Sequence, residues 1–281
     1  MVKVFRTIGE MKNIARDWGR SGLSIGFVPT MGCLHDGHAS LIKKSVSQND
    51  KTVVSIFVNP TQFGPEEDLD KYPRDFDSDL ELCQNIGVDA IFFPEPSMMY
   101  SDNYNTYVNV KQLTNNLCGK SRKNHFEGVC TVLTKLFNIV KPDYAYFGKK
   151  DAQQLCVVKR MVEDLNFDLK IIGCDIVRES DGLAMSSRNK YLSSDERAAA
   201  LCLNKSLNVA KRLISAGKTD VNMIRSEMIE FISKQPLAKV DYVEIVDGCS
   251  LQPITCITKP CLIAIAVYIG KTRLIDNFYY E

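Results

Sequence analysis

Hydrophobic residues follow two alternating patterns along the first half of the chain. Short apolar runs, partly β-branched and as long as a buried strand, alternate with stretches in which apolar residues recur at helical spacing. The strand-like runs are 23–29, 52–58, 88–94, 143–147 and 169–175, and the helical stretches are 40–46, 76–86, 129–140 and 152–165. Because each crossover helix returns the chain to the same sheet, this order predicts a doubly wound parallel sheet with helices on both faces, a Rossmann-like α/β fold.

The pattern changes after residue 175. The expected elements there are helices at 193–216 and 221–233 and strands at 240–246, at 262–269 and near Arg273. Serine at the start of the first helix, acidic residues in its first turn and Gly217 after its end fit the capping and dipole preferences of a helix. We therefore expect a Rossmann-like domain over 1–177 and a smaller α+β domain over 178–281.

Composition argues against several other classes of protein. The chain has 35 Lys and Arg against 34 Asp and Glu, a formal charge of +1, so no electrostatic excess favours nucleic acid or a membrane surface as a partner. The longest apolar run, 261–269, is about half of the ~20 residues of a transmembrane helix, and residues 1–10 lack the apolar core of a secretory signal. The 10 cysteines lack metal-knuckle or redox spacing, which predicts free thiols in a reducing cytoplasm.

The first candidate site follows the first predicted strand, where residues 29–38 read PTMGCLHDGH. If a helix begins near Asp36, His35 and His38 lie on one side of its first turn, beside backbone N–H groups and the positive end of the helix dipole. Phosphate binds well there, imidazole donors stabilise charge on a reacting phosphorus, and Gly37 leaves room for a nucleotide. The alternatives are a surface pair or half of a zinc site, although no third ligand lies nearby.

Two further segments follow predicted strands. In NPTQFG, Asn59 and Gln62 offer neutral donors and acceptors to a small polar substrate, unless the segment is a plain turn. Residues 144–154 read YAYFGKKDAQQ, in which a lysine is able to neutralise phosphate, Asp151 to accept ribose hydroxyls, and a glutamine one turn into the helix to hold a substrate hydroxyl or carboxylate. The two lysines are equally consistent with a solvated surface pair.

A polar loop follows the predicted domain boundary, and residues 178–189 read RESDGLAMSSRN. Ser186, Ser187 and Arg188 suit triphosphate oxygens, and such a loop is able to close over them as a lid. A domain linker is the alternative.

Taken in order, these segments resemble the pantoate–β-alanine ligase (pantothenate synthetase) family over nearly the whole chain. The specific motifs are PTMGCLHDGH, SIFVNPTQFG with the following DLDKYPRD, HFEGVCTVLTKLFNIVKPDYAYFGKKDAQQL, and DGLAMSSRNKYLS. In the wider nucleotidylyltransferase superfamily, HDGH corresponds to the HIGH-type signature and MSSRN to the mobile KMSKS-type loop. The resemblance therefore implies a HIGH-type nucleotidylyltransferase fold.

The resemblance also implies roles for individual residues. The implied ATP-binding residues are Met31, Gly32, Cys33, Leu34, His35, Asp36, Gly37, His38, Gly148, Lys149, Lys150, Asp151, Val177, Met185, Ser186, Ser187 and Arg188. The implied catalytic residues are His38, as proton donor, with His35, Lys150, Ser186 and Arg188. Pantoate and β-alanine are expected to contact Gln62 and Gln154, together with Asn59 in the turn.

The implied reaction has two steps. The pantoate carboxylate attacks the α-phosphorus of Mg-ATP and releases diphosphate, and the amine of β-alanine then attacks the resulting pantoyl adenylate and expels AMP. ATP with Mg²⁺ is the implied co-substrate, and Asp77 and Asp79 are candidate metal ligands. A cytoplasmic homodimer that binds small molecules, with neither nucleic acid nor membrane as partner, is the expected setting.

The chain departs from the family pattern at two places. Lys149 stands where an acidic residue is common, which alters the local charge, and residues 122–126 read RKNHF where RPGHF is common, which predicts a less rigid loop. Two rival functions remain open: a nucleotidylyltransferase that stops after transferring AMP or CMP, and a nucleotide sensor without catalysis.

Overall fold

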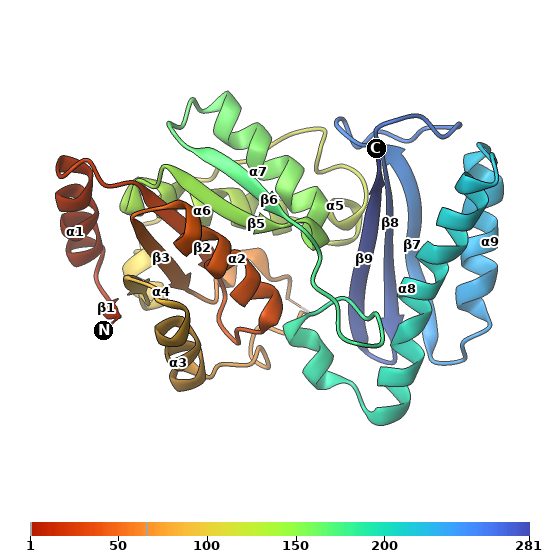
Figure 1. The fold of residues 1–281 in the computed structure, drawn as a ribbon, viewed down its shortest axis with the longest axis horizontal. Helices are drawn as coiled ribbons and strands as arrows, with labels where there is room; N and C mark the ends of the chain where they lie inside the picture. The colour runs from red at the N-terminus through yellow and green to blue at the C-terminus, as the bar shows by residue number, and fades with distance from the viewer. Residues whose placement is uncertain (1, 66) are drawn as a thin grey trace. The chain divides into compact units, whose positions relative to one another are not determined.

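The structure is a computed structural model, and it describes residues 2–65 and 67–281 (Figure 1). Its elements are β1 (Lys3–Phe5), α1 (Ile8–Arg20), β2 (Ile25–Thr30), α2 (Asp36–Gln48), β3 (Lys51–Ile56), the 3-10 helix η1 (Pro60–Gln62), α3 (Phe76–Ile86), β4 (Ala90–Phe92), α4 (Pro96–Met99), α5 (Cys118–Ser121), α6 (His125–Val140), β5 (Tyr144–Gly148), η2 (Lys149–Asp151), α7 (Ala152–Asp164), β6 (Lys170–Cys174), η3 (Ser187–Tyr191), α8 (Ser194–Ser215), α9 (Val221–Ser233), β7 (Ala238–Asp247), β8 (Cys261–Ile269) and β9 (Thr272–Tyr280).

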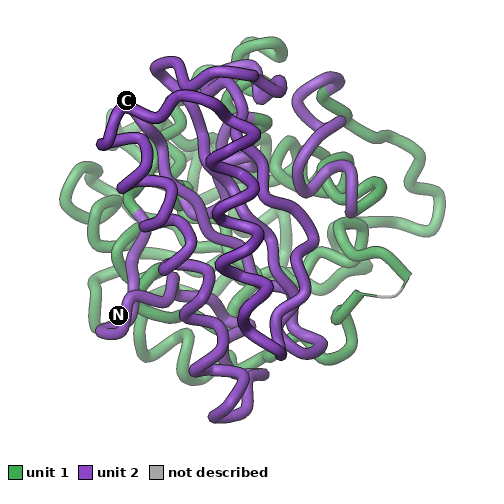
Figure 2. The backbone as a smooth tube through the Cα atoms, turned by 90° about the vertical axis from the view of Figure 1, so that its right-hand side faces the viewer, with its two compact units in different colours: residues 1–110, 122–149, 157–175 green, residues 111–121, 150–156, 176–281 purple. Residues whose placement is uncertain are grey.

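The backbone divides into two compact units, which Figure 2 shows in different colours. Unit 1 holds the residues up to 110 together with 122–149 and 157–175, and unit 2 holds 111–121, 150–156 and 176–281. The sequence-based boundary after Val177 is two residues from the last of these boundaries. No pattern in the sequence assigns 111–121 or 150–156 to the C-terminal unit, because only contacts between distant parts of the chain do so.

Unit 1 is built on a six-stranded sheet in the order β1-β4-β3-β2-β5-β6, with every neighbouring pair parallel. Consecutive side chains of a strand point to opposite faces. On β2, Phe27 contacts Phe137 of α6, with ring centroids 6.3 Å apart, and Val28 belongs to the same buried cluster as Ile42 of α2. Helices α6 and α2 therefore cover opposite faces, and the predicted doubly wound α/β fold is confirmed.

Two N-terminal elements, β1 and α1, were not predicted. Of the three residues of β1 two are exposed, so no apolar run marks this edge strand, and α1 buries only Met11 and Ala15. Helices α2 and α6 begin at Asp36 and His125 rather than at 40 and 129. Their first turns carry polar residues and glycine, and hydrophobic spacing does not detect such turns.

Unit 2 contains a three-stranded antiparallel sheet in the order β7-β8-β9. In β8, alternate residues from Cys261 to Ile269 pack in one core with α8 and α9. Leu262 and Ala264, from the same strand, belong to a second cluster with Leu117 and Ala152. Because β8 is buried on both faces, its sequence is an almost continuous apolar run, and the predicted strand is confirmed.

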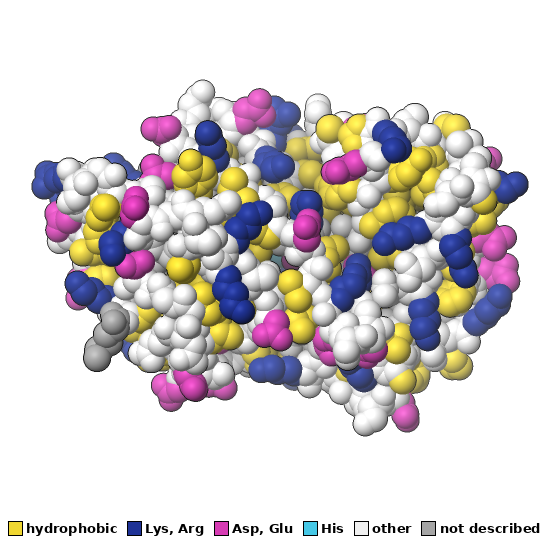
Figure 3. Space-filling model, viewed as in Figure 1, with side chains coloured by type: hydrophobic (Ala, Val, Ile, Leu, Met, Phe, Trp, Pro, Cys, Tyr) yellow, Lys and Arg dark blue, Asp and Glu magenta, His cyan; other side chains and the backbone are white. Residues whose placement is uncertain are grey.

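The surface and the cysteines carry little further information about partners. Figure 3 shows Lys and Arg interspersed with Asp and Glu over the visible face, as the charge balance predicts. Across residues 2–65 and 67–281, no helix has both the length and the apolar character needed to cross a bilayer. The ten cysteines all lie in the described part of the chain, and none forms a disulfide there.

Candidate active site

Three of the predicted site segments begin where neighbouring parallel strands of unit 1 end. Strand β2 pairs with β3 up to Thr30 and Ile56, and it pairs on its other side with β5, which ends at Gly148. The carboxyl ends of parallel strands share one edge of the sheet, where ligands of such folds bind. The histidine segment, the Asn-Pro turn and the glycine turn therefore leave the same edge.

The N-terminus of α2 is capped by the two predicted histidines. His35 is the N-cap residue, and its Nδ1 accepts the N–H of Gly37 at 3.1 Å. The N–H of His35 donates in turn to Nδ1 of His38 at 3.3 Å. The pair makes a capping box in which imidazoles replace the usual hydroxyl and carboxylate. The ring centroids are 4.1 Å apart, which confirms that both rings lie on one side of the first turn.

This capping box determines where each imidazole carries its proton. A backbone N–H only donates, so Nδ1 of His35 and Nδ1 of His38 both act as acceptors. Each neutral ring then has its proton on Nε2. Two Nε2–H donors beside the positive end of α2 form an arrangement suited to phosphoryl oxygens.

The loop before α2 is anchored by Asp79 of α3. Its carboxylate, only 2% exposed, accepts the N–H groups of Cys33 at 2.9 Å and Leu34 at 2.6 Å. Gly32 and Cys33 have positive φ of 82° and 50°, and a Cβ added at Gly32 would lie 3.0 Å from the carboxylate. Asp79 therefore holds the loop in a left-handed turn that favours glycine.

The anchoring role bears on the magnesium hypothesis. Both oxygens of Asp79 serve the loop, and Asp77 is an exposed residue in the first turn of α3. Within the described ranges, no group of three His, Cys, Asp or Glu side chains is placed to hold a metal ion. These residues do not fit a magnesium site built from protein ligands.

The turn after β3 presents Gln62 through its neighbour Asn59. Asn59 is 1% exposed, and its Nδ2 donates to Oε1 of Gln62 at 3.2 Å and to the carbonyl of Gly128 at 3.1 Å. Its Oδ1 accepts the hydroxyls of Tyr100 at 2.8 Å and Thr61 at 3.0 Å. Because protein groups engage its whole amide, Asn59 orients Gln62, and the predicted direct contact with substrate is not needed to explain it.

The contact with Asn59 fixes which end of the Gln62 amide donates. Since Oε1 accepts from Asn59, Nε2 is the end directed away from that residue, and it lies 2.6 Å from Sδ of Met31. The second segment thereby touches the first segment within unit 1. A donor at this position suits a carboxylate or hydroxyl of a small substrate.

The glycine turn after β5 accounts for one departure from the family pattern. Nζ of Lys149 lies 2.7 Å from Oδ1 of Asp175, which has a 90% exposed side chain. The hydrogen bond from Lys149, helped by its charge, lowers the pKa of Asp175. A carboxylate from the end of β6 therefore balances the lysine that stands where the family commonly has an acid.

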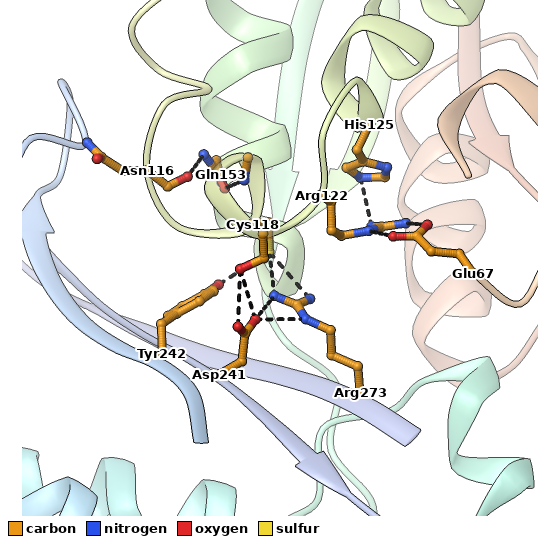
Figure 4. A network of polar contacts seen from close by, with 11 residues as sticks. Glu67, Asn116, Cys118, Arg122, His125, Gln153, Asp241, Tyr242 and Arg273 are labelled. Carbon is orange, nitrogen blue, oxygen red and sulfur yellow. Dashed lines mark hydrogen bonds and ion pairs between the residues drawn. The ribbon is translucent and has the colours of Figure 1, made fainter. Parts of the chain in front are cut away.

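The remaining predicted site residues belong to unit 2. The carbonyl of Lys150 accepts Nδ2 of Asn277 at 2.7 Å, which ties η2 to β9. Gln153 is buried, and its Nε2 donates to the carbonyls of Leu113 at 2.8 Å and Asn116 at 2.7 Å (Figure 4). Of the two adjacent glutamines, the first is thus structural and Gln154 is half-buried, and the contact of Gln154 with substrate stays a prediction.

The polar loop of unit 2 is held at its base. Arg178 forms a two-pronged ion pair with Asp276, at 2.7 and 2.9 Å, and the N–H of Met185 donates to the carbonyl of Val177 at 3.0 Å. Ser186 caps η3, because its Oγ accepts the N–H of Arg188 at 3.3 Å. Closure of this loop as a lid stays a prediction.

The predicted ATP residues are therefore shared between the two units. Residues 31–38, 148 and 149 belong to unit 1, and residues 150, 151, 177 and 185–188 belong to unit 2. Gly128, Tyr100 and His125, for which no role was predicted, also contact the Asn-Pro turn. The sequence signal for His125 and Gly128 is the HFEGVC stretch that contains both, and Tyr100 has none.

Comparison with known proteins identifies the family of the chain. The family model described as pantoate-beta-alanine ligase matches residues 3–279. The pantothenate synthetase of Clostridium botulinum strain Loch Maree is 58% identical over 280 residues, and that of Clostridium acetobutylicum is 57% identical, each match covering 100% of both chains.

Two solved structures of this family have the same fold. The crystal structure of pantothenate synthetase from Thermus thermophilus has a TM-score of 0.92 at 40% identity, covering 99% of each chain. Pantoate-beta-alanine ligase from Francisella tularensis, complexed with beta-gamma ATP and beta-alanine, has a TM-score of 0.82 at 35% identity and covers 99% of this chain and 98% of that one. The chain belongs to the pantoate–β-alanine ligase family.

Proposed function

We propose that the chain condenses pantoate with β-alanine through a pantoyl adenylate, consuming ATP and releasing diphosphate and AMP. The observation that carries this proposal is the pair of Nε2–H donors of His35 and His38 at the N-terminus of α2, together with the oriented Gln62 amide, which contacts Met31 of the same segment. Family membership supports the reaction, and the Francisella relative, which is complexed with beta-gamma ATP and beta-alanine, supports the two substrates.

In the first step, the pantoate carboxylate attacks the α-phosphorus of ATP. The bond from that phosphorus to the bridging oxygen breaks, and its electron pair leaves with diphosphate. His35 and His38 donate to phosphoryl oxygens as negative charge grows, with His38 as the proton donor, and Lys150, Ser186 and Arg188 neutralise the phosphates. Adenine contacts the backbone at Val177, and Asp151 accepts the ribose hydroxyls.

In the second step, the β-alanine amine attacks the acyl carbon of the adenylate. The bond from that carbon to the AMP oxygen breaks, its electron pair leaves with AMP, and an amide forms as the attacking nitrogen loses one proton to solvent. A free carboxylate is a poor acylating agent because its leaving group would be oxide, whereas AMP leaves readily. Gln62 and Gln154 hold pantoate for both steps, and the C-terminal domain, 178–281, acts as a lid that keeps water from the mixed anhydride.

The setting of the reaction is part of the proposal. No protein ligand is assigned to magnesium, which would be held by the ATP phosphates and water, since the described His, Cys, Asp and Glu side chains form no metal-binding group. We further propose a homodimer formed through the first domain, working in the cytoplasm on small molecules alone. Sedimentation equilibrium of the purified chain tests the dimer.

The experiment that tests the function is a diphosphate-release assay with ATP, in which pantoate and β-alanine are varied independently. A ligase releases AMP only when β-alanine is present. A plain nucleotidylyltransferase transfers the nucleotide and stops, and a sensor binds ATP without turnover. Either of those outcomes would overturn the proposal.

Lys150→Ala tests the phosphate lysine within the same assay. We expect a folded protein whose pantoate-dependent exchange of diphosphate into ATP falls by about 10²–10³-fold, the typical loss when one charge-stabilising group is removed. Lys149→Ala is the matched control and should lose far less, because its Nζ already pairs with Asp175. Unchanged exchange in Lys150→Ala would refute the assigned role.

A further inference from the structure

The third histidine of the chain begins the HFEGVC stretch and has no assigned role in the reaction, yet it contacts the NPTQFG turn. His125 is the first residue of α6, and its Nδ1 is 2.8 Å from the backbone carbonyl oxygen of Gln62. Its Nε2 is 3.0 Å from Nη1 of Arg122. Arg122 donates in turn from Nε and Nη2 to the two carboxylate oxygens of Glu67, at 2.7 and 2.6 Å (Figure 4). The four residues form one hydrogen-bonded chain within unit 1.

The arginine determines the tautomer of His125. A guanidinium has donors only, so Nε2 of His125 must accept from Arg122, and the ring proton is on Nδ1. That proton is donated to the carbonyl of Gln62. A ring protonated at both nitrogens would direct an N–H at the guanidinium, so the contact fits only the neutral imidazole.

Glu67 balances the charge of the arginine. Burial of its carboxylate acts to raise its pKa, but the hydrogen bond and the positive charge of Arg122 outweigh burial, so the pKa of Glu67 lies below its ordinary value of 4.5. The Arg122 and Glu67 side chains are 15% and 26% exposed. An ionised, largely enclosed pair is more rigid than a solvated surface pair, and it holds the guanidinium against the imidazole.

The short helix η1, which ends at Gln62, has too few internal hydrogen bonds to fix its own conformation. Gln62 ends a 3-10 helix of three residues, and so short a turn has few internal hydrogen bonds. Asn59 binds the side chain of Gln62, and His125 binds its backbone. The amide that meets the substrate is thereby fixed from two directions.

The conformation of the loop before α6 helps to hold His125 against Gln62. Asn124 has a left-handed backbone, with φ of 62°, and asparagine is one of the few residues apart from glycine that adopt it readily. The residue stands where the family commonly has glycine. The left-handed turn and the Arg122–Glu67 pair hold the RKNHF loop, which the sequence alone predicted to be less rigid.

We propose that His125 is a positioning residue for substrate binding, and that Glu67 and Arg122 lock its tautomer so that it holds Gln62 in place. This inference rests on the proposed function, in which Gln62 contacts pantoate and β-alanine. His125 itself touches no substrate in this proposal.

Two substitutions of His125 separate the hydrogen bond from mere bulk. The amide nitrogen of asparagine takes the place of Nδ1, so His125→Asn keeps a donor toward Gln62. Glutamine places its amide nitrogen at the Nε2 position instead, so His125→Gln loses that donor while keeping a similar size. We expect His125→Gln to raise KM for pantoate and β-alanine about tenfold, the usual effect of one lost hydrogen bond, and to leave KM for ATP within about twofold. His125→Asn should recover most of the loss.

A second pair of variants tests whether the Glu67–Arg122 ion pair fixes the tautomer of His125. Glu67→Gln removes the charge that holds Arg122, and we expect a several-fold rise in the same two KM values with KM for ATP unchanged. Glu163→Gln is the matched control, since Glu163 pairs with Arg160 on the surface of unit 1 with a 71% exposed side chain, and it should change nothing. If His125→Gln does not fold, the Glu67 pair carries the test by itself.

The outcomes are distinguishable from failure of the proposed function. A wild-type chain without pantoate- and β-alanine-dependent release of diphosphate and AMP refutes the function. An active wild type in which both His125 variants behave alike, or in which KM for ATP rises equally, refutes the positioning role.

Discussion

A single methyl group added at Gly128 tests whether close packing of α6 positions the substrate turn. A Cβ at Gly128 would lie 2.7 Å from Cα of Gln62 and still closer to the carbonyl of Thr61. Carbon atoms in contact are about 3.5–4.0 Å apart, so the turn must move by roughly 1 Å. That displacement falls on the residue proposed to contact pantoate.

The expected energies oppose one another. Alanine in place of glycine inside a helix stabilises by about 1 kcal/mol, whereas overpacking a buried contact costs about 1–3 kcal/mol. Gly128→Ala should therefore lower the free energy of unfolding by about 1 kcal/mol. A misplacement of ~1 Å reduces turnover by up to about 10²-fold, so kcat/KM for pantoate should fall far more than stability does.

The assay pairs urea unfolding with steady-state kinetics, and the chain offers a matched control. Gly19, in the last turn of α1, has nothing within 4 Å of an added Cβ, so Gly19→Ala should be stabilising or neutral with unchanged kinetics. If Gly128→Ala were as stable as wild type with the same kcat/KM, the turn would be free to shift, and the argument that α6 positions Gln62 would be wrong.

Three further predictions concern thiols, the base of the polar loop and acid stability. The exposed Cys249 and Cys256 should react rapidly with DTNB at pH 8. Burial raises the pKa of Cys83 to about 12, so this thiol should react only after unfolding. Early reaction of Cys83 would contradict the packing of α3. Asp276→Asn should cost about 3 kcal/mol in urea unfolding, because it leaves a partly buried guanidinium without its anion, and a loss below ~1 kcal/mol would show that the pair contributes little. Glu67 has a lowered pKa in the folded state, so the stability that its charge contributes is complete above pH 4.5 and is lost as pH falls through the lower folded pKa. The difference in unfolding free energy between wild type and Glu67→Gln should therefore shrink in that pH range. A difference that stays constant would exclude the ion pair as its source.

An element was predictable from the sequence when the contacts that stabilise it lie close together along the chain. The run 261–269 was recognised as a strand because burial on both faces leaves a continuous apolar sequence, and helices α3 and α9 were placed at their observed ends, 76–86 and 221–233. β1 was missed because two of its three residues are exposed, so its place in the sheet depends on pairing with β4, which lies far along the chain.

The candidate site divides in the same way. His35 and His38 were recognised together because they are three residues apart at the start of one helix, and the capping box that orients them is equally local. Asp79 was taken for a metal candidate because nothing in the sequence shows that it accepts N–H groups from a loop 45 and 46 residues away. Gln153, next to the substrate candidate Gln154, likewise has a structural role that depends on distant residues, since its amide donates to the carbonyls of Leu113 and Asn116.

The sequence by itself determined the periodicity of the elements, the helix caps and the motifs that identify the family, since each depends on residues within a few positions of one another. The tertiary structure alone decided which of the predicted site residues hold other residues in place. Whether an amide or carboxylate is available to a ligand depends on hydrogen bonds from distant elements, as the chain from Glu67 through Arg122 and His125 to Gln62 illustrates. Such bonds form only after hydrophobic packing has brought those elements together.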